Sequence, residues 1–294
     1  MNLGINLGFA NNRYPEPEVW TSIVKQIGLD NVQFVADILN PSLKKWDSKY
    51  YDDLVQRTKY EIFKNDINVS SMMTSSFTRV NHFAHPDFGY RKIWFDWFVE
   101  FLKMGEVFGA KQLGSHFGIM TVDSEKNNER HCYDEAIRLW AELSKIAYDL
   151  GYECLFFEPM SVNREFGDTI EKSLKIYDDL NSLSKIPFKI CLDIGHAPHP
   201  TQRNPYEWLE RLVDKSCMIH LQQTTENNSN HSPFTKKFND IGIVNSKKVI
   251  EIIKNHKANP DLILEISFRE KYENEKIIVE SLKESVEYWK KECL

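Results

Sequence analysis

One stretch of this sequence decides how the chain folds: residues 190–196 read Ile190-Cys191-Leu192-Asp193-Ile194-Gly195-His196. The stretch begins as an unbroken apolar run, reaches a carboxylate at Asp193 and carries an imidazole three positions later. A run that is apolar at successive positions suits a strand of a parallel sheet, because helices cover both faces of such a sheet. We therefore expect Asp193 at the carboxyl end of a buried parallel strand.

Three further apolar runs end in one polar residue. They are 155–158, which ends in Glu158, 217–220, which ends in His220, and 262–265, which ends in Glu265. The strands of a (β/α)8 barrel run in one direction, so their carboxyl ends meet at one rim, where such barrels build their active sites. The sequence therefore predicts that these three residues converge with Asp193 at one rim.

Apolar runs alternate with helical patterns along the whole chain. Strands are expected at 3–9, 31–37, 67–74, 110–116, 153–159, 188–194, 217–222 and 261–267. Helices are expected near 16–28, 50–65, 90–108, 129–150, 169–184, 205–214, 245–257 and 274–292. Eight strand–helix units close a barrel, so the sequence predicts the α/β class and a single (β/α)8 TIM barrel over residues 1–294. The Asn-rich stretch 227–231 is expected to be a polar loop.

Composition and charge exclude several kinds of partner. With 294 residues, 41% of them hydrophobic and 27% charged, the chain is typical of one globular domain. A net charge of −6 argues against a nucleic-acid surface, which is usually basic. We expect no membrane span and no signal peptide, because no apolar run approaches about 20 residues. The five cysteines form no CxxC pair, which fits the reducing cytoplasm.

The four strand-end residues have the chemistry of a metal site. Glu158, Asp193, His220 and Glu265 would offer carboxylate oxygens and one imidazole nitrogen to a divalent cation. This oxygen-rich set favours Mn²⁺, with Mg²⁺, Co²⁺ or Zn²⁺ as alternatives. The sequence therefore predicts one bound divalent ion that acts as a Lewis acid on a carbonyl or hydroxyl oxygen.

Two of these residues also suit proton transfer. If a 2-ketose binds the ion through two neighbouring oxygens, the proton on the adjacent carbon becomes acidic. Carboxylates on opposite faces of that carbon would remove the proton and return it from the other side, which inverts the stereocentre. Glu158 and Glu265 are the predicted catalytic pair. The alternative is that both are rim carboxylates paired with Lys or Arg.

The order of these residues resembles a known group of barrels. Glu, Asp-x-x-His, His and Glu on the fifth to eighth strands resemble the xylose-isomerase-like barrel superfamily and, within it, the ketose 3-epimerases. The resemblance implies that Glu158, Asp193, His220 and Glu265 bind one Mn²⁺ or related ion and that the two Glu residues form the acid–base pair. It also implies that His196 contacts substrate oxygens.

Several segments resemble a narrower family, the tetrulose-phosphate epimerases of erythritol catabolism, which invert C3 of erythrulose phosphate between its L and D forms. These segments are 12–18, 77–82, 114–118, 157–162 and 220–224. The free-ketose 3-epimerases carry an Arg shortly after the histidine of the seventh strand, whereas Gln222, Gln223 and Thr224 stand here. The distal end of the substrate must therefore be held differently, and Gln222 is a candidate contact.

A phosphate group would need donors elsewhere on the rim. An Arg fork with hydroxyl and imidazole donors suits a phosphate dianion. The predicted substrate-binding residues after the third and fourth strands are Arg79, Asn81, His82, Ser115 and His116. Further candidates on rim loops are Arg13, Arg164, His231, Lys236 and Lys237. The alternative for Arg79 is a solvated or acid-paired rim residue.

The sequence predicts a cytoplasmic isomerase, an epimerase whose partner is a small sugar phosphate, and leaves other functions open. A ketose–aldose isomerase or a free-ketose 3-epimerase would use the same residues. A phosphodiesterase of the endonuclease IV type shares the Asp-x-x-His pattern but would need more metal ligands and a basic face. A non-catalytic binding barrel is the remaining alternative. The subunit count stays open, and a homo-oligomer is compatible with the sequence.

Overall fold

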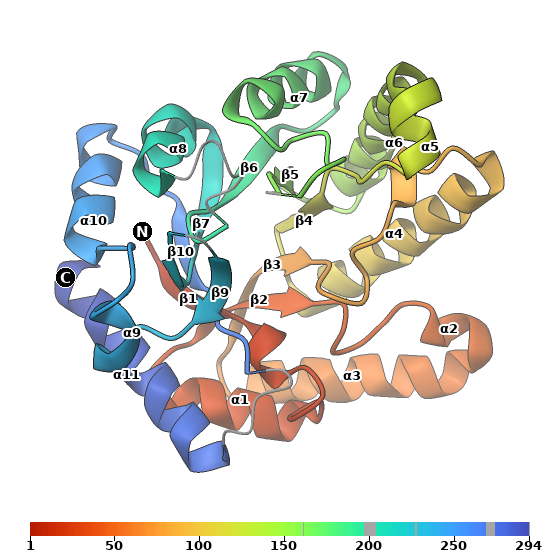
Figure 1. The fold of residues 1–294 in the computed structure, drawn as a ribbon. Coiled ribbons are helices and arrows are strands. Elements are labelled where there is room, and N and C mark those ends of the chain that lie inside the picture. The colour runs from red at the N-terminus through yellow and green to blue at the C-terminus, as the bar shows by residue number, and fades with distance from the viewer. Residues whose placement is uncertain (161, 197–203, 227, 269–273, 294) are drawn as a thin grey trace.

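Eight parallel strands close into a barrel in the order β1-β10-β7-β6-β5-β4-β3-β2 (Figure 1). The computed structural model describes all residues except 161, 197–203, 227, 269–273 and 294. The barrel strands are β1 (Leu3–Asn6), β2 (Asn31–Val35), β3 (Asn68–Met73), β4 (Gln112–His116), β5 (Cys154–Glu158), β6 (Phe188–Asp193), β7 (Ser216–Leu221) and β10 (Asp261–Leu264). The predicted (β/α)8 barrel is confirmed.

Helices surround the barrel (Figure 1). The eight predicted helices are present as α1 (Pro17–Gln26), α3 (Ser48–Lys64), α4 (Phe88–Phe108), α6 (Glu129–Asp149), α7 (Ile170–Leu183), α8 (Pro205–Leu212), α10 (Ser246–Asn255) and α11 (Glu275–Cys293). Three short helices were not predicted: α2 (Leu43–Trp46), α5 (Val122–Asn127) and α9 (Lys236–Asn239). Among the described helices, none has the length and hydrophobicity needed to cross a lipid bilayer.

Local sequence explains where several helices begin and end. At the start of α8, the side chain of Asn204 accepts hydrogen bonds from the backbone N–H groups of Tyr206 and Glu207, and Pro205 occupies the first turn. Helix α4 ends at Gly109, whose φ of 83° is easily adopted by a residue without a Cβ atom. These caps fix where the helix begins or ends, and so where the loop that joins it to the neighbouring strand begins.

A small apolar cluster fills the barrel beneath its carboxyl-terminal rim. Its buried members are Met73, Phe156, Cys191, Met218 and Ile263. Four of them lie two positions before Glu158, Asp193, His220 and Glu265, respectively. Because side chains alternate between the two faces of a strand, the four polar residues point towards the same interior as the cluster. The apolar cluster therefore forms the floor on which the polar residues lie.

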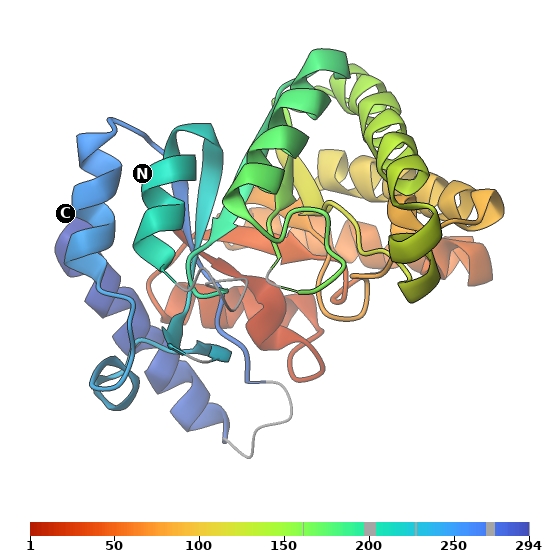
Figure 2. The same ribbon diagram turned by 45° about the horizontal axis from the view of Figure 1, so that its top comes forward.

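One strand prediction and one loop prediction need correction. The expected strand at 3–9 stops at Asn6, because its side chain accepts a hydrogen bond from the N–H of Gly8 at 2.7 Å and turns Leu7–Ala10 into a 3-10 helix. The expected polar loop at 227–231 was wrong for residues 228–231, which belong to β9 (Asn228–Ser232) and pair antiparallel with β8 (Gln223–Thr225). Residue 227 lies outside the described residues. Figure 2 shows this hairpin beside the loop that carries α9.

Candidate active site

The four predicted metal ligands lie together at the carboxyl ends of their strands. Their ligand atoms, one from each of Glu158, Asp193, His220 and Glu265, all lie within 4.8 Å of one another. Nδ1 of His220 lies 3.2 Å from Oε1 of Glu158 and 3.2 Å from Oε2 of Glu265. One imidazole nitrogen thus faces two carboxylates, one at the end of β5 and one directly after β10.

A buried glutamine orients His220. Oε1 of Gln33, on β2, lies 2.8 Å from Nε2 of His220 and also accepts a hydrogen bond from the amide of Asn6 at 2.6 Å. The Gln33 amide nitrogen donates to the hydroxyl of Ser71 at 3.1 Å, which fixes the orientation of the amide. Nε2 of His220 therefore donates to Gln33, while Nδ1 faces the two carboxylates and is the nitrogen that a metal ion would bind. This is the orientation that a metal-binding histidine requires.

Asp193 is held by backbone and side-chain donors. Its Oδ1 accepts hydrogen bonds from the N–H groups of Gly195 at 2.6 Å and His196 at 3.1 Å. Its Oδ2 accepts from the amide of Gln222 at 2.8 Å. A Cβ atom at Gly195 would lie 2.1 Å from the Gln222 side chain, so only glycine allows this approach. Burial raises the pKa of Asp193, and the charges of Glu265 and Glu158 raise it further.

The residues present fit a divalent cation. Three carboxylates meet in a site where burial penalises their charge, and a cation is the partner that offsets both burial and repulsion. Oε2 of Glu265 is buried and accepts no hydrogen bond within the described structure. The thiol of Cys191 lies 3.2 Å from Nε2 of His220, which is the nitrogen turned away from the carboxylates, and burial raises the pKa of Cys191 to about 12. The four converging strand-end residues themselves offer oxygen and imidazole nitrogen donors.

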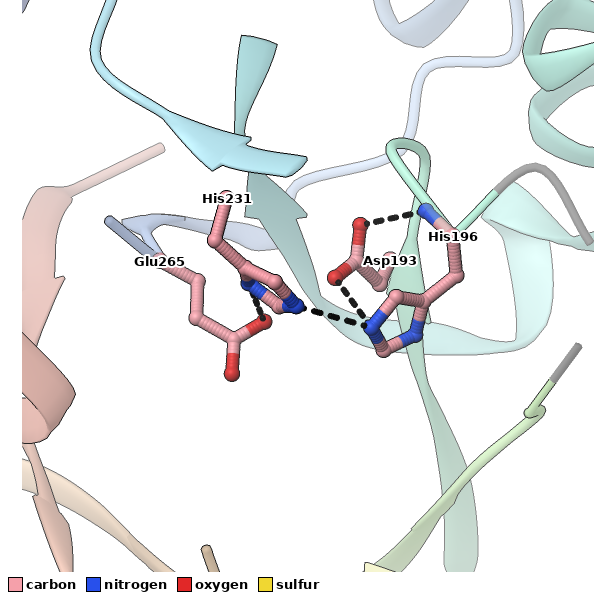
Figure 3. Close-up of side chains that lie close together, drawn as sticks. All are labelled: Asp193, His196, His231 and Glu265. Carbon is pink, nitrogen blue, oxygen red and sulfur yellow. Dashed lines mark hydrogen bonds and ion pairs between the residues drawn. The ribbon is translucent and has the colours of Figure 1, made fainter. Parts of the chain in front are cut away.

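Two more histidines reach the same place (Figure 3). Nε2 of His196 lies 3.3 Å from Oδ2 of Asp193 and 3.4 Å from Nε2 of His231. Nδ1 of His231 lies 3.6 Å from Oε2 of Glu265. Burial lowers the pKa of His196 to about 4, so this imidazole is neutral at physiological pH. A neutral imidazole can bind a metal ion or accept a hydrogen bond from a substrate hydroxyl.

A cavity of about 330 Å³ opens above these groups. This volume is at the lower end of the range for small-molecule sites, about 300–1,000 Å³. Its described lining residues are Asn6, Gly8, Asn11, Met73, Thr74, Ser75, Ser76, Arg79, His116, Glu158, Met160, His196, His231, Glu265, Ile266 and Ser267. Arg79 is the one Arg or Lys in this lining, and its Nη1 lies 3.5 Å from the sulfur of Met160.

The loop after β3, which carries Arg79, is fastened by a carboxylate. Oδ2 of Asp37 accepts from the N–H of Phe77 at 3.0 Å and from the amide of Asn11 at 3.3 Å, and Oδ1 accepts from the hydroxyl of Thr78 at 2.9 Å. The same Asn11 amide donates to the hydroxyl of Ser75 at 3.3 Å. Asp37 therefore ties the loops after β1, β2 and β3 together beside the cavity.

His116, which lines the cavity, faces a buried carboxylate. Its Nδ1 lies 2.8 Å from Oε1 of Glu165, and both side chains are almost fully buried. The ring of His82 lies behind it, 4.3 Å from the His116 ring centroid. Burial lowers the pKa of His82 well below its usual value, so His82 adds no positive charge at neutral pH. Glu165 thus faces one edge of the His116 ring while the ring itself lines the cavity.

The structure separates the predicted substrate-binding residues into two groups. Arg79, His116 and His196 line the cavity, and their contact with substrate stays a prediction. The other four lie outside its described lining, and each has a partner or a packing role. Asn81 donates to the carbonyl of Ile119, His82 packs behind His116, Ser115 shares a hydrogen bond with Thr74, and Gln222 holds Asp193.

The further candidates for phosphate binding also fall into two groups, one that lines the cavity and one that does not. Only His231 lines the cavity. Arg13 donates to the carbonyl of Phe268, Arg164 donates to the carbonyl of Met120, and Lys236 pairs with Asp240. The nitrogen of Lys237 lies over the ring of Phe238.

Three residues of the site were not recognised from the sequence in the roles that their contacts indicate. Gln33 lies inside an apolar run, where the lone amide is the only signal of a polar role. Glu165 follows β5 in a loop without a periodic pattern. His231 was expected in a polar loop, and the uniformly polar sequence of residues 228–232 gives no signal of a strand.

A closed (β/α)8 barrel with carboxylates and histidines gathered at its strand ends is the architecture of a barrel enzyme. The family model described as the xylose isomerase-like TIM barrel matches residues 15–291, and the chain belongs to this family. This agrees with the superfamily that the order of the strand-end residues suggested.

Particular relatives are sugar epimerases. The chain is 29% identical over 300 residues to D-erythrulose 1-phosphate 3-epimerase of Brucella abortus (strain 2308), a match that covers 98% of this chain and 95% of the relative. Isomerase is also the class that the sequence predicted.

Solved structures share the fold along the whole chain. A protein of Rhodospirillum rubrum ATCC 11170, provisionally described as a xylose isomerase, superposes with a TM-score of 0.88 at 22% identity and 99% coverage of both chains. D-Psicose 3-epimerase of Clostridium cellulolyticum H10, solved with D-tagatose, gives a TM-score of 0.76 at 13% identity, again over 99% of both chains. At these identities the likeness concerns the fold.

Proposed function

We propose that this protein is a metal-dependent epimerase that inverts C3 of a short ketose phosphate, erythrulose phosphate, from the L to the D form. The observation that carries the proposal is the placement of Glu158 and Glu265. Each has a carboxylate oxygen 3.2 Å from the same nitrogen of His220, both line the cavity, and β6 and β7 separate their strands in the barrel. Two carboxylates so placed can reach one carbon atom from two sides.

The proposed metal ligands are Glu158, Asp193, His220 and Glu265. A divalent ion held there, Mn²⁺ in our proposal, would polarise the ketose carbonyl and make the C3 proton more acidic. One of the two glutamates removes that proton, and the other returns a proton to the opposite face of the planar enediolate. His196 and His116 line the same cavity and hold the sugar hydroxyl groups, with Glu165 fixing the orientation of His116.

The phosphate end of the substrate is assigned to the opposite side of the cavity. The loop after β3 contributes Ser75, Ser76 and Arg79 to the lining, and β3 lies across the barrel from β7, which carries His220. Hydroxyl donors next to a guanidinium suit a phosphate dianion. The similarity to an erythrulose 1-phosphate epimerase supports a phosphorylated substrate. We also propose a cytoplasmic location and a role in erythritol breakdown, and the four described cysteines, all free thiols, fit a reducing compartment.

The experiment that tests the function is a proton NMR assay in D₂O with the Mn²⁺-loaded protein. L-Erythrulose 1-phosphate, free L-erythrulose and the corresponding aldose phosphate are each supplied as substrate. The proposal expects deuterium at C3, inversion of C3 and faster turnover of the phosphorylated ketose. Because the L and D forms are enantiomers with the same NMR spectrum, inversion is followed by optical rotation. Appearance of an aldose would assign a ketose–aldose isomerase instead. Faster turnover of free erythrulose would assign a free-ketose epimerase, and no exchange with any substrate would contradict an epimerase.

A further inference from the structure

A methionine sulfur lies beside the guanidinium of the cavity. Nη1 of Arg79 donates a hydrogen bond to the sulfur of Met160 at 3.5 Å, and both residues belong to the described lining. Met160 follows Glu158, the last residue of β5, by two positions, whereas Arg79 comes from the loop after β3. The contact therefore joins the side of the rim that carries Glu158 to the loop to which we assign the phosphate.

The other methionines lie in different surroundings. Among the described residues, Met160 is the one methionine whose sulfur accepts a hydrogen bond from a charged side chain. Four of the others are at most 3% exposed and pack in the core: Met72, Met73, Met104 and Met218. Of these four, Met73 also reaches the cavity, where it belongs to the apolar floor. A sulfur that combines contact with the cavity and contact with a cation is therefore particular to Met160.

The hydrogen bond between Arg79 and Met160 is a weak one. A thioether sulfur is uncharged and only a weak acceptor, so it holds the guanidinium at the cavity without neutralising its charge. Arg79 has several N–H donors and is exposed at the mouth of the cavity. A phosphate dianion is a far stronger acceptor than a thioether. The phosphate of a substrate can therefore take Arg79 from the sulfur at little cost.

A small oxidant can reach this sulfur through the cavity. The side chain of Met160 is buried, with 4% of its surface exposed, but it lines a cavity of about 330 Å³. Arg79 and Ser76 are exposed where this cavity meets the solvent. A water molecule takes up about 30 Å³ in the liquid, and hydrogen peroxide is only slightly larger. The cavity is therefore wide enough to admit a peroxide to the sulfur of Met160.

Oxidation would change the character of this acceptor. A lone pair of the sulfur forms an S–O bond with one oxygen of hydrogen peroxide while the O–O bond breaks, so the sulfur loses two electrons. The departing hydroxide takes the proton of the transferred oxygen and leaves as water. The product is methionine sulfoxide, a polar side chain in place of an apolar one.

The sulfoxide oxygen would meet the guanidinium that already faces the sulfur. It carries a partial negative charge, so Arg79 donates to it more strongly than to a thioether. A phosphate would then lose a donor and face an additional partial negative charge on Met160. A free ketose has no phosphate to lose this contact, so its turnover is not affected in the same way.

We propose that Met160 is a modification site, oxidised by peroxides to the sulfoxide, and that the sulfoxide withdraws Arg79 from the phosphate of the substrate. The modification itself follows from the sulfur, the cavity and the guanidinium. Its effect on turnover rests on the proposed function. The oxidised protein loses its preference for a phosphorylated ketose and keeps its activity on the free ketose.

The test combines peptide mass spectrometry with kinetics. The Mn²⁺-loaded protein is treated with hydrogen peroxide in the presence of free methionine, which serves as the reference for complete oxidation. We expect one added oxygen on Met160 and none on Met104 in the core. The value of kcat/KM for erythrulose phosphate should fall by up to about tenfold, the factor expected for loss of the Arg79 donor. The value for free erythrulose should hardly change.

Three variants separate this effect from other damage. Met160→Leu keeps an apolar side chain of similar size but has no sulfur, so peroxide should leave its kinetics unchanged. Met120→Leu is the matched control, because Met120 lines a separate cavity with Tyr133 and Phe166, and it should respond to peroxide as the wild type does. In Arg79→Ala, oxidation of Met160 should cause no further loss on the phosphorylated ketose.

An unmodified Met160 beside fully oxidised free methionine would overturn the proposal without any variant having to fold. Equal losses on both sugars would overturn it as well, as would a loss in Met160→Leu as large as in the wild type. The outcome is separable from that of the proposed function. If the protein turns over no ketose, isothermal titration with inorganic phosphate before and after peroxide still decides: weaker binding after oxidation supports the proposal, and unchanged binding overturns it.

Discussion

The two halves of the barrel rim differ in charge. One half, formed by β5, β6, β7 and β10, carries three carboxylates and His220. The other half, formed by β1 and β3 with their loops, lines the cavity with amides, hydroxyls and Arg79, and no carboxylate of the described lining comes from it. The first half suits a cation and the second suits an anion. A substrate with a phosphate at one end and a ketone near the other would therefore be oriented by charge before any shape is matched.

The two halves also differ in how firmly they are held. Asp193 and His220 are buried and bonded to Gln222, Gln33 and the backbone. Arg79 and Ser76 are exposed at the mouth of the cavity. Chemistry needs groups that are preorganised to within a fraction of an ångström, whereas holding a phosphate tolerates a longer and more mobile side chain. Mutations in the carboxylate half should therefore lower the catalytic rate. Mutations in the half that carries Arg79 should lower the preference for a phosphorylated substrate.

The largest effect is expected from the acid–base pair of the carboxylate half. Glu158→Gln and Glu265→Gln keep the volume but remove the proton acceptor, so each should lower kcat by about 10²–10⁴-fold. The measurement is the rate of deuterium incorporation at C3. Glu142→Gln, which breaks a surface pair with Lys145, should leave the rate unchanged. A variant of either residue that exchanges the C3 proton at the wild-type rate would remove that residue from the mechanism.

The second effect tests how firmly the carboxylate half is held. Gln33→Met removes the acceptor that fixes the protonated nitrogen of His220, and loss of such an orienting partner typically weakens metal affinity by about 10–100-fold. Isothermal titration with Mn²⁺ measures this affinity. Gln26→Met, on the exposed side of α1, is the matched control. Equal affinities in all three proteins would mean that Gln33 does not orient His220.

The third effect tests the other half. Arg79→Ala should lower kcat/KM for erythrulose phosphate by roughly tenfold, because a hydrogen bond to a charged group contributes about 1.5–3 kcal/mol and exposure brings the loss to the lower end. Activity on free erythrulose should hardly change. Arg138→Ala, whose arginine pairs with Glu135 on α6, serves as control. Equal losses on both sugars would contradict the assignment of the phosphate to this half.

The smallest effect concerns a histidine outside both halves. Hydrogen bonds to Glu210 and Asp214 raise the pKa of His256. Because the folded pKa is raised, this stabilisation is present below the unfolded pKa of about 6.5 and is lost as pH rises through the folded value. His256→Gln should therefore lower the unfolding free energy at pH 6 by less than about 1 kcal/mol and have no effect at pH 9. Thermal denaturation at the two pH values measures this, and an equal change at both would reject the pairing.

The sequence predicted the barrel and the place where the carboxylate half converges. Apolar runs that end in Glu158, Asp193, His220 and Glu265 specify both strand burial and rim position, because parallel strands end at one edge. Alternation along each strand then directs these side chains towards the barrel interior. For this half, the pattern that predicts each strand therefore also predicts where its last polar residue lies in the barrel.

The opposite half and the supporting residues were harder to predict, since their positions depend on contacts between distant segments. Asn81, His82 and Ser115 are neighbours in sequence of the cavity residues Arg79 and His116, but their side chains turn to other partners. Loops have no periodicity from which a side-chain direction can be inferred. The β8–β9 hairpin was not predicted, because a polar two-stranded ribbon lacks the apolar pattern of a buried strand.

The carboxylate of Asp37 has a consequence for protein engineering. It cross-links three loops, through Asn11, Phe77 and Thr78, without touching the carboxylate half of the rim. A designer who wishes to change the sugar that is accepted could therefore replace residues 74–79 as one cassette while Asp37 and Asn11 stay in place as its anchor. A replacement that keeps the Thr78 hydroxyl and a backbone N–H at position 77 would keep the attachment to Asp37, whereas loss of the hydroxyl would leave a carboxylate oxygen of Asp37 without this donor.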